Sequence, residues 1–162
     1  MNSTPTRHPD LPAFGLPGRI QAANSRPRTI ALVGLGEGGA GIARNVAAQG
    51  LAQVEVHVLA KSATGGDALA AIKAGGAELQ RDLTSADMIF IVTCPGDDVG
   101  LASVVSSIAR SRNHPVTALY VVPHDAGSGE DETLRTLRSA VEMLVVVSDE
   151  SYVPAMIAAL GT

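Results

Sequence analysis

The chain has 162 residues, of which 46% are hydrophobic, 17% charged and only 2% aromatic, and its formal net charge is −4. This length predicts a single domain. The scarcity of aromatic rings and the negative charge argue against a protein that binds nucleic acid or an anionic membrane surface. The single Cys94 excludes an intramolecular disulfide and a cysteine-based zinc site. No apolar run approaches the ~20 residues of a membrane span, and no secretory signal is visible, which predicts a cytoplasmic protein.

The first 28 residues differ from the rest of the chain. They contain five prolines and four arginines but a single acidic residue, Asp10. Prolines at this density remove backbone donors and interrupt helices and strands. Residues 1–28 are therefore predicted to form a flexible tail, and residues 29–162 a single α/β domain of the nucleotide-binding type.

From residue 29 onward, apolar runs alternate with amphipathic segments. Strands are predicted at residues 30–33, 54–59, 88–93, 116–122 and 144–147, with an additional edge strand at 77–81. Helices are predicted at residues 39–49, 67–74, 99–112, 130–141 and 151–160. Strands that are apolar on both faces belong to a parallel sheet covered on both sides. The predicted fold is therefore α/β, a doubly wound and mostly parallel sheet with helices on both faces, in which ligands bind beyond the carboxyl ends of the strands.

A glycine-rich turn joins the first strand to the first helix. Its glycines are Gly34, Gly36, Gly38, Gly39 and Gly41. Such a turn lets phosphates approach free main-chain N–H groups at a helix N-terminus, so it is a candidate phosphate site. The alternative is a turn that only packs the helix against the sheet. Glu37 favours that alternative, because a second negative charge repels phosphate.

Polar residues follow the third and fourth strands, at the edge where a ligand would bind. Cys94, Asp97 and Asp98 follow one strand, and His124 and Asp125 follow the other. A cysteine nucleophile with a histidine base and a carboxylate–histidine metal site are both compatible with these residue types. Neither spacing is distinctive, so solvated loop residues are the preferred interpretation and no catalytic residue is predicted.

One reading of the turn is an NADP-binding domain of an oxidoreductase. The spacing Gly34-x-Gly36-x-x-Gly39 fits a dinucleotide fingerprint. The acidic residue that would hold the ribose hydroxyls is replaced by Lys61 and Ser62, which suits only a 2′-phosphate.

The order of several segments resembles the nucleotide-binding domain of the tubulin/FtsZ family. The first strand, glycine loop and first helix of that family are similar to IALVGLGEGGAGIARNVAAQGL at residues 30–51. Later segments of the family resemble DALAAIKAGGAELQ, SADMIFIVTCPGDDVGLASVVSSIAR, VTALYVVP and LRTLRSAVEMLVVVSDESYV. The resemblance is collinear from about residue 29 to residue 153.

This resemblance implies a site for GTP or GDP. The phosphates would rest on the turn that contains Gly34, Gly36, Glu37, Gly38, Gly39 and Gly41, and on Gly96 and Gly100 of the loop after the third strand. Ser62 and Thr64 would lie near the ribose, and Asp149 near the base or ribose. Asp97 or Asp98 would hold a magnesium ion between the carboxylates and the phosphates.

Several departures from the family pattern set the expected activity. Asp97 and Asp98 replace small neutral residues, and the loop that carries them is about two residues shorter than in the family. The acidic catalytic loop and the second domain of the family have no counterpart in these residues. The expectation is a binding or regulatory module rather than a self-activated GTPase, partnered by a second copy or by a full-length tubulin/FtsZ-like protein. A remaining alternative is an interaction or structural protein with a non-functional pocket.

Overall fold

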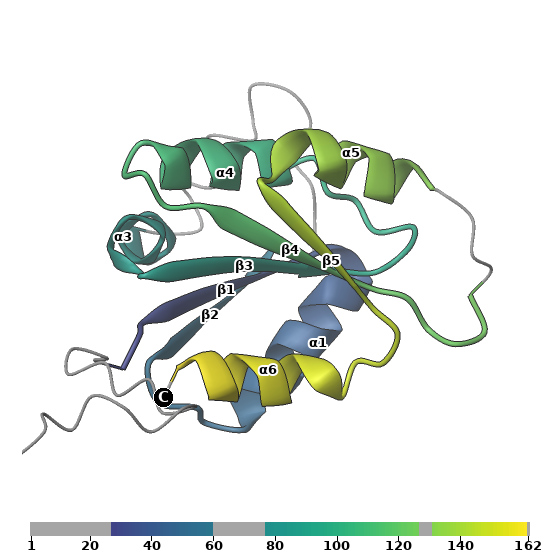
Figure 1. Ribbon diagram of the computed structural model, residues 1–162, viewed down its shortest axis with the longest axis horizontal. Coiled ribbons are helices and arrows are strands. Elements are labelled where there is room, and N and C mark those ends of the chain that lie inside the picture. The colour runs from purple at the N-terminus through teal and green to yellow at the C-terminus, as the bar shows by residue number, and fades with distance from the viewer. Residues whose placement is uncertain (1–26, 60–76, 127–130, 162) are drawn as a thin grey trace, which may run out of the picture.

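In the part of the chain that the structure describes, five parallel strands form one sheet in the order β2-β1-β3-β4-β5 (Figure 1). The computed structural model describes residues 27–59, 77–126 and 131–161. The strands are β1 (Ile30–Leu35), β2 (Val54–Leu59), β3 (Met88–Thr93), β4 (Val116–Val121) and β5 (Met143–Val147). β1 lies between β2 and β3, and its residue Ile30 is opposite Val54 of β2 and Met88 of β3.

Helices cover both faces of this sheet. Those in the described residues are α1 (Gly36–Ala48), α3 (Ala77–Ser85), α4 (Ala102–Arg110), α5 (Glu132–Ala140) and α6 (Tyr152–Leu160). Figure 1 shows α3, α4 and α5 on one side and α1 and α6 on the other. Successive strand residues point to opposite faces, so Ala31 and Val33 pack under the first group of helices, and Ile30 and Leu32 under the second. The predicted doubly wound parallel sheet is confirmed.

The predicted edge strand at residues 77–81 is wrong, because these residues begin helix α3. Leu79 and Leu83 stand four residues apart and are both fully buried, which is the spacing of one helical face. Asp82 lies between them and contacts Nε2 of His57 on β2 at 3.0 Å. The predicted helix at 67–74 and residues 1–26 of the predicted tail lie outside the described residues.

Candidate functional site

The glycine turn between β1 and α1 is occupied by a carboxylate from the protein's own chain. Asp97, in the loop after β3, accepts hydrogen bonds from the main-chain N–H groups of Gly38 at 3.0 Å and Gly39 at 2.9 Å. Its Oδ2 atom also accepts the N–H of Cys94 at 2.8 Å and the hydroxyl of Thr93 at 3.2 Å. A helix N-terminus offers unpaired N–H donors and a partial positive charge. The anion that these donors hold is therefore Asp97.

Two glycines of the turn are needed for contacts within the chain. Gly36 has a φ of +73°, and a Cβ atom there would lie 2.5 Å from Cγ of Asp97. A Cβ atom on Gly39 would lie 2.1 Å from the carbonyl oxygen of Val92, because α1 begins directly against β3. The turn thus has the residue types of a phosphate loop. Gly36, however, leaves room for the Asp97 side chain, and Gly39 allows α1 to pack directly against β3.

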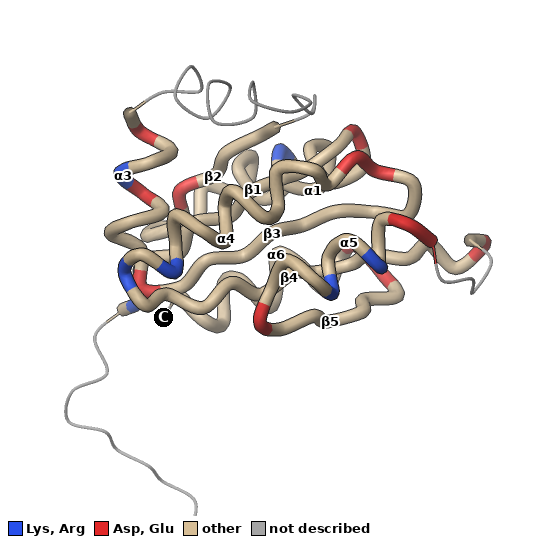
Figure 2. The backbone as a smooth tube through the Cα atoms, turned by 90° about the horizontal axis from the view of Figure 1, so that it is seen from above, with Lys and Arg blue, Asp and Glu red and all other residues tan. Residues whose placement is uncertain are grey.

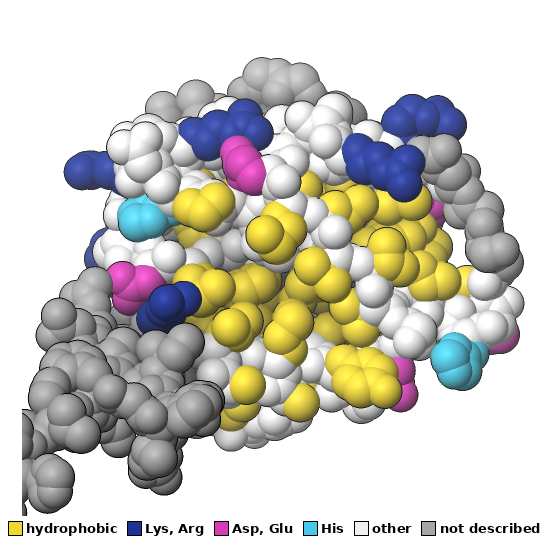
Figure 3. Space-filling model, viewed as in Figure 1, with side chains coloured by type: hydrophobic (Ala, Val, Ile, Leu, Met, Phe, Trp, Pro, Cys, Tyr) yellow, Lys and Arg dark blue, Asp and Glu magenta, His cyan; other side chains and the backbone are white. Residues whose placement is uncertain are grey.

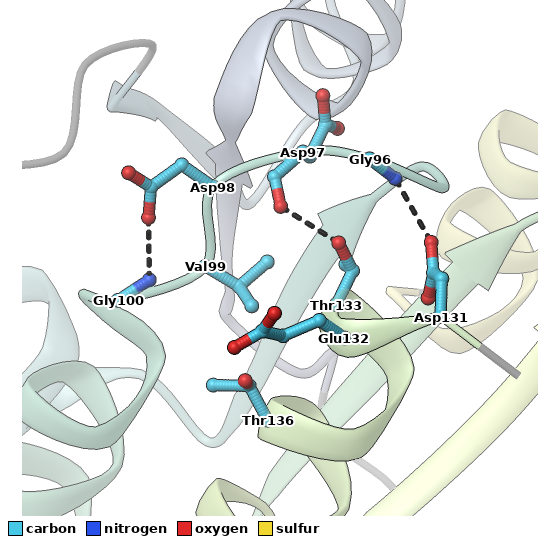
Figure 4. Close-up of a pocket in the computed structure, with 9 residues that line it drawn as sticks. All are labelled: Gly96, Asp97, Asp98, Val99, Gly100, Asp131, Glu132, Thr133 and Thr136. Carbon is cyan, nitrogen blue, oxygen red and sulfur yellow. Dashed lines mark hydrogen bonds between the residues drawn. The ribbon is translucent and has the colours of Figure 1, made fainter.

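The loop that carries Asp97 is fixed to the start of α5 (Figure 4). Asp131 accepts the main-chain N–H of Gly96 at 2.9 Å and, as the N-cap of α5, the N–H of Leu134 at 2.9 Å. The hydroxyl of Thr133 donates to the carbonyl oxygen of Asp97 at 2.8 Å. These contacts hold the backbone on both sides of Asp97 and thereby aim its side chain at the glycine turn.

Asp131 and Thr133 were not identified as site residues from the sequence. The only signal was an aspartate at the start of a predicted helix, which indicates an N-cap but not its second contact with the loop. Burial opposes the charge of Asp131, but hydrogen bonds from Leu134, Tyr120 and Gly96 outweigh it and lower the pKa of this carboxyl. Burial and the same hydrogen bond to Asp131 raise the pKa of Tyr120.

Asp97 and Asp98 point in different directions and do not form a cation site (Figure 4). Asp98 is exposed, and its carboxylate accepts the N–H of Gly100 at 3.0 Å. N–H donors face both oxygens of Asp97, where a cation would have to bind. Within residues 27–59, 77–126 and 131–161, no group of three or more His, Cys, Asp or Glu side chains is arranged to hold a metal. The two carboxylates therefore do not hold a cation between them, and a magnesium ion held by Asp98 together with phosphates stays a prediction.

Among the residues that the structure describes, two cavities adjoin the loop after β3. One, of about 530 Å³, lies between this loop and the start of α5; its lining includes Asp98, Asp131 and Glu132. The other, of about 260 Å³, lies beyond the ends of β3, β4 and β5, and its lining residues are Ile42, Cys94, Val121, Pro123, His124, Ser148, Asp149 and Glu150. The second cavity is just below the ~300–1,000 Å³ of pockets for drug-sized ligands, so it suits a smaller molecule.

The carboxyl ends of the strands form an acidic edge. Figure 2 shows acidic residues gathered at the end of the molecule where α1 and α5 begin. In the described residues, the acidic residues between the ends of β1, β3, β4 and β5 and the first turn of the helix after each are Glu37, Asp97, Asp98, Asp125, Asp131, Glu132, Asp149 and Glu150. Like charges at this edge oppose a triphosphate, since unit charges about 4 Å apart repel by roughly 4 kcal/mol near a protein surface.

The predicted site residues fall into three groups. The first group lies at the junction of β1 and α1 and in the loop after β3, two segments that the Asp97 hydrogen bonds join. Its members at the junction are Gly34, Gly36, Glu37, Gly38, Gly39 and Gly41, and its members in the loop are Gly96, Asp97, Asp98 and Gly100. Asp149 follows β5, lines the smaller cavity and accepts the N–H of Ser151 at 2.8 Å. Ser62 and Thr64, with Lys61 of the NADP reading, lie outside the described residues.

Cys94 and His124 both line the smaller cavity. Burial, together with the negative charges of Asp97 and Glu150, raises the pKa of the Cys94 thiol to about 11. Since the thiolate is the nucleophile, this thiol is poorly suited to nucleophilic catalysis at neutral pH.

No protein-family model matches this sequence, and no curated protein matches it. The resemblance to the tubulin/FtsZ family therefore stays a prediction from the residues. No helix in the part of the chain that the structure describes is long and apolar enough to cross a membrane.

Proposed function

We propose that this chain is a tubulin/FtsZ-like domain of the nucleotide-binding type that works as an interaction module and carries no GTP on its glycine turn. The observation that supports a turn without GTP is the Asp97 carboxylate on the N–H groups of Gly38 and Gly39, and the family likeness comes from the order of the sequence segments alone. The residue pattern of the turn is that of a phosphate site, and its donors are already paired with an internal anion.

A phosphate group reaches these donors only after Asp97 leaves them. Hydrogen bonds to a charged group contribute about 1.5–3 kcal/mol each when buried, and Asp97 gives up three main-chain bonds. A loss of about 3 kcal/mol in total already weakens binding by more than 100-fold. Repulsion from neighbouring carboxylates, including Glu37, adds to this penalty.

Titration with a fluorescent GTP analogue in the presence of Mg²⁺ tests the proposal. The wild type is expected to show no saturable binding, and the variant Asp97→Ser, which frees the donors, is expected to gain binding. Asp98→Ser is the matched control, because it removes the neighbouring carboxylate without opening the turn. GTP-selective, magnesium-dependent binding by the wild type contradicts the proposal, as does an Asp97→Ser variant that binds no better than Asp98→Ser.

The cavity of about 260 Å³ favours a second candidate function, binding of a nucleoside without phosphates. It combines apolar walls from Ile42 and Val121 with polar groups on Ser148 and Asp149. Saturation-transfer NMR with guanosine tests this candidate, with Ser148→Trp as the variant that fills the rim. A signal from the wild type that the variant loses supports nucleoside binding. Saturation-transfer NMR with NADPH tests the alternative hypothesis of an NADP-binding domain, which saturable binding of NADPH would support.

A further inference from the structure

The edge strand β5 is apolar, and within residues 27–59, 77–126 and 131–161 no strand pairs with its outer side. Its five residues, MLVVV, include no charged residue and no proline. Met143 is 58% exposed and Val146 61% exposed, and Tyr152 at the start of α6 is 62% exposed. Figure 3 shows hydrophobic side chains gathered over β5, between α5 and α6. Proteins usually protect such edges, because unpaired strands recruit other strands.

The opposite edge of the sheet carries this protection. β2 has an exposed Glu55 and, two residues later, His57, which is paired with Asp82. Charged and polar residues on an edge strand discourage pairing with another chain. The contrast singles out β5 as the edge that is open to association.

The main-chain groups of β5 that face away from the sheet belong to Leu144 and Val146. The carbonyl oxygen of Val147 accepts the N–H of Val122, so it points toward β4. The N–H and C=O groups of one strand residue point to the same side, and successive residues alternate. The main-chain groups of Met143 and Val145 therefore point toward β4, as those of Val147 do. The main-chain groups of Leu144 and Val146 point away from the sheet.

We propose that a second copy of this chain docks on this edge, with the two β5 strands antiparallel and Val145 of each copy on the two-fold axis. In this register Leu144 of one copy faces Val146 of the other, and the outward N–H and C=O groups of both residues form hydrogen-bonded pairs. Met143 then faces Val147. Each of the five apolar side chains thus meets an apolar side chain, and the two sheets become one.

The charges at the ends of β5 are compatible with this arrangement. Glu142 falls opposite Ser148 of the other copy rather than opposite a second carboxylate. Its own charge is paired with Arg110, and its other oxygen accepts the N–H of Val116 at 2.9 Å. The contact uses the same strand on both copies, so it closes on itself as a dimer instead of continuing as a filament.

This inference gives the proposed interaction module its partner and rests on that proposed function. Its test does not involve the glycine turn, so dimer measurements and nucleotide titrations succeed or fail independently.

Sedimentation of the full chain as a function of concentration is the first test. The expected species is a dimer of 33 kDa, twice the 16.5 kDa of one chain. Val146→Asp, at an exposed position, places a charge in each half of the contact and is expected to raise the dissociation constant by about 100-fold. The matched control Ala52→Asp, in the exposed turn before β2, is expected to leave the dimer unchanged.

Oxidative crosslinking tests the register without relying on stability. In a Cys94→Ser background, Val145→Cys is expected to form a disulfide-linked dimer, because residues opposite each other in a non-hydrogen-bonded pair have Cα atoms about 4.5 Å apart. Val146→Cys is the control, since the two copies of that residue are roughly 8 Å apart, beyond the reach of a disulfide.

Three results overturn the inference. The first is a wild type that stays monomeric at every concentration, which leaves the edge to a partner of different sequence. The second is a dimer that Val146→Asp does not weaken. The third is crosslinking through Val146→Cys that is as fast as through Val145→Cys.

Discussion

Replacing Asp97 with alanine should destabilise the domain although the residue lies in a loop. The variant leaves the N–H groups of Gly38, Gly39 and Cys94 without their acceptor. The site is partly exposed, so each bond contributes roughly 1 kcal/mol, below the buried value, and the sum is about 3 kcal/mol. For a domain of this size the melting temperature falls by roughly 2–4 °C per kcal/mol, which predicts a decrease of roughly 6–12 °C.

Thermal unfolding followed by circular dichroism measures this decrease. Asp98→Ala is the control, because that exposed carboxylate accepts one main-chain bond, from Gly100, and its loss should cost less than about 1 kcal/mol. Inorganic phosphate should raise the melting temperature of Asp97→Ala, since it replaces the missing anion, and leave the wild type unchanged. A variant at residue 97 that melts within about 2 °C of the control at residue 98 refutes the assigned role of the carboxylate.

Three further predictions concern glycines, a thiol and a carboxyl. Gly39→Ala should destabilise the domain by several kcal/mol, because its Cβ would lie 2.1 Å from a carbonyl oxygen. Gly41→Ala places a Cβ with no atom within 4 Å and should stabilise α1 by about 0.5–1 kcal/mol. Urea unfolding of both variants measures the difference in their free energies of unfolding. The alkylation rate of Cys94 should keep rising up to about pH 11, while that of a free thiol levels off near its lower pKa, and a plateau for Cys94 at pH 9 would refute the raised pKa. The main-chain N–H of Val116 and the guanidinium of Arg110 lower the pKa of Glu142, so its contribution to stability is present above its ordinary pKa of 4.5 and is lost as the pH falls through the lowered value. Glu142→Gln should therefore show a flatter loss of stability between pH 5 and 3 than the wild type in acid titrations at fixed urea; identical curves would contradict this.

Much of the fold could be predicted from the sequence because its signals are local. Each buried strand is a short apolar run, and each neighbouring helix carries apolar residues three or four positions apart. The failure at residues 77–81 has the same origin. Ala77 and Leu79 alternate as in a strand, and only Leu83, beyond that window, reveals the helical spacing.

The glycine turn could be picked out from the sequence as a candidate site, but its occupation by the Asp97 carboxylate could not. The glycines place N–H groups that have no acceptor within the helix at the start of α1, and a sequence pattern identifies them. Which of the adjacent carboxylates turns toward those groups depends on contacts distant in sequence. Thr133 and Asp131, more than thirty residues away, fix the backbone around Asp97, and Gly96 contributes a φ of +80°. No local pattern in the loop distinguishes Asp97 from Asp98.

One carboxylate, that of Asp131, is bonded at the same time to the loop amide of Gly96 and to the capping amide of Leu134. Protonating or displacing this single group releases the two segments in one event. Hydrogen exchange at these two amides should therefore share a common opening step, even though they belong to different elements and lie 38 positions apart in the chain.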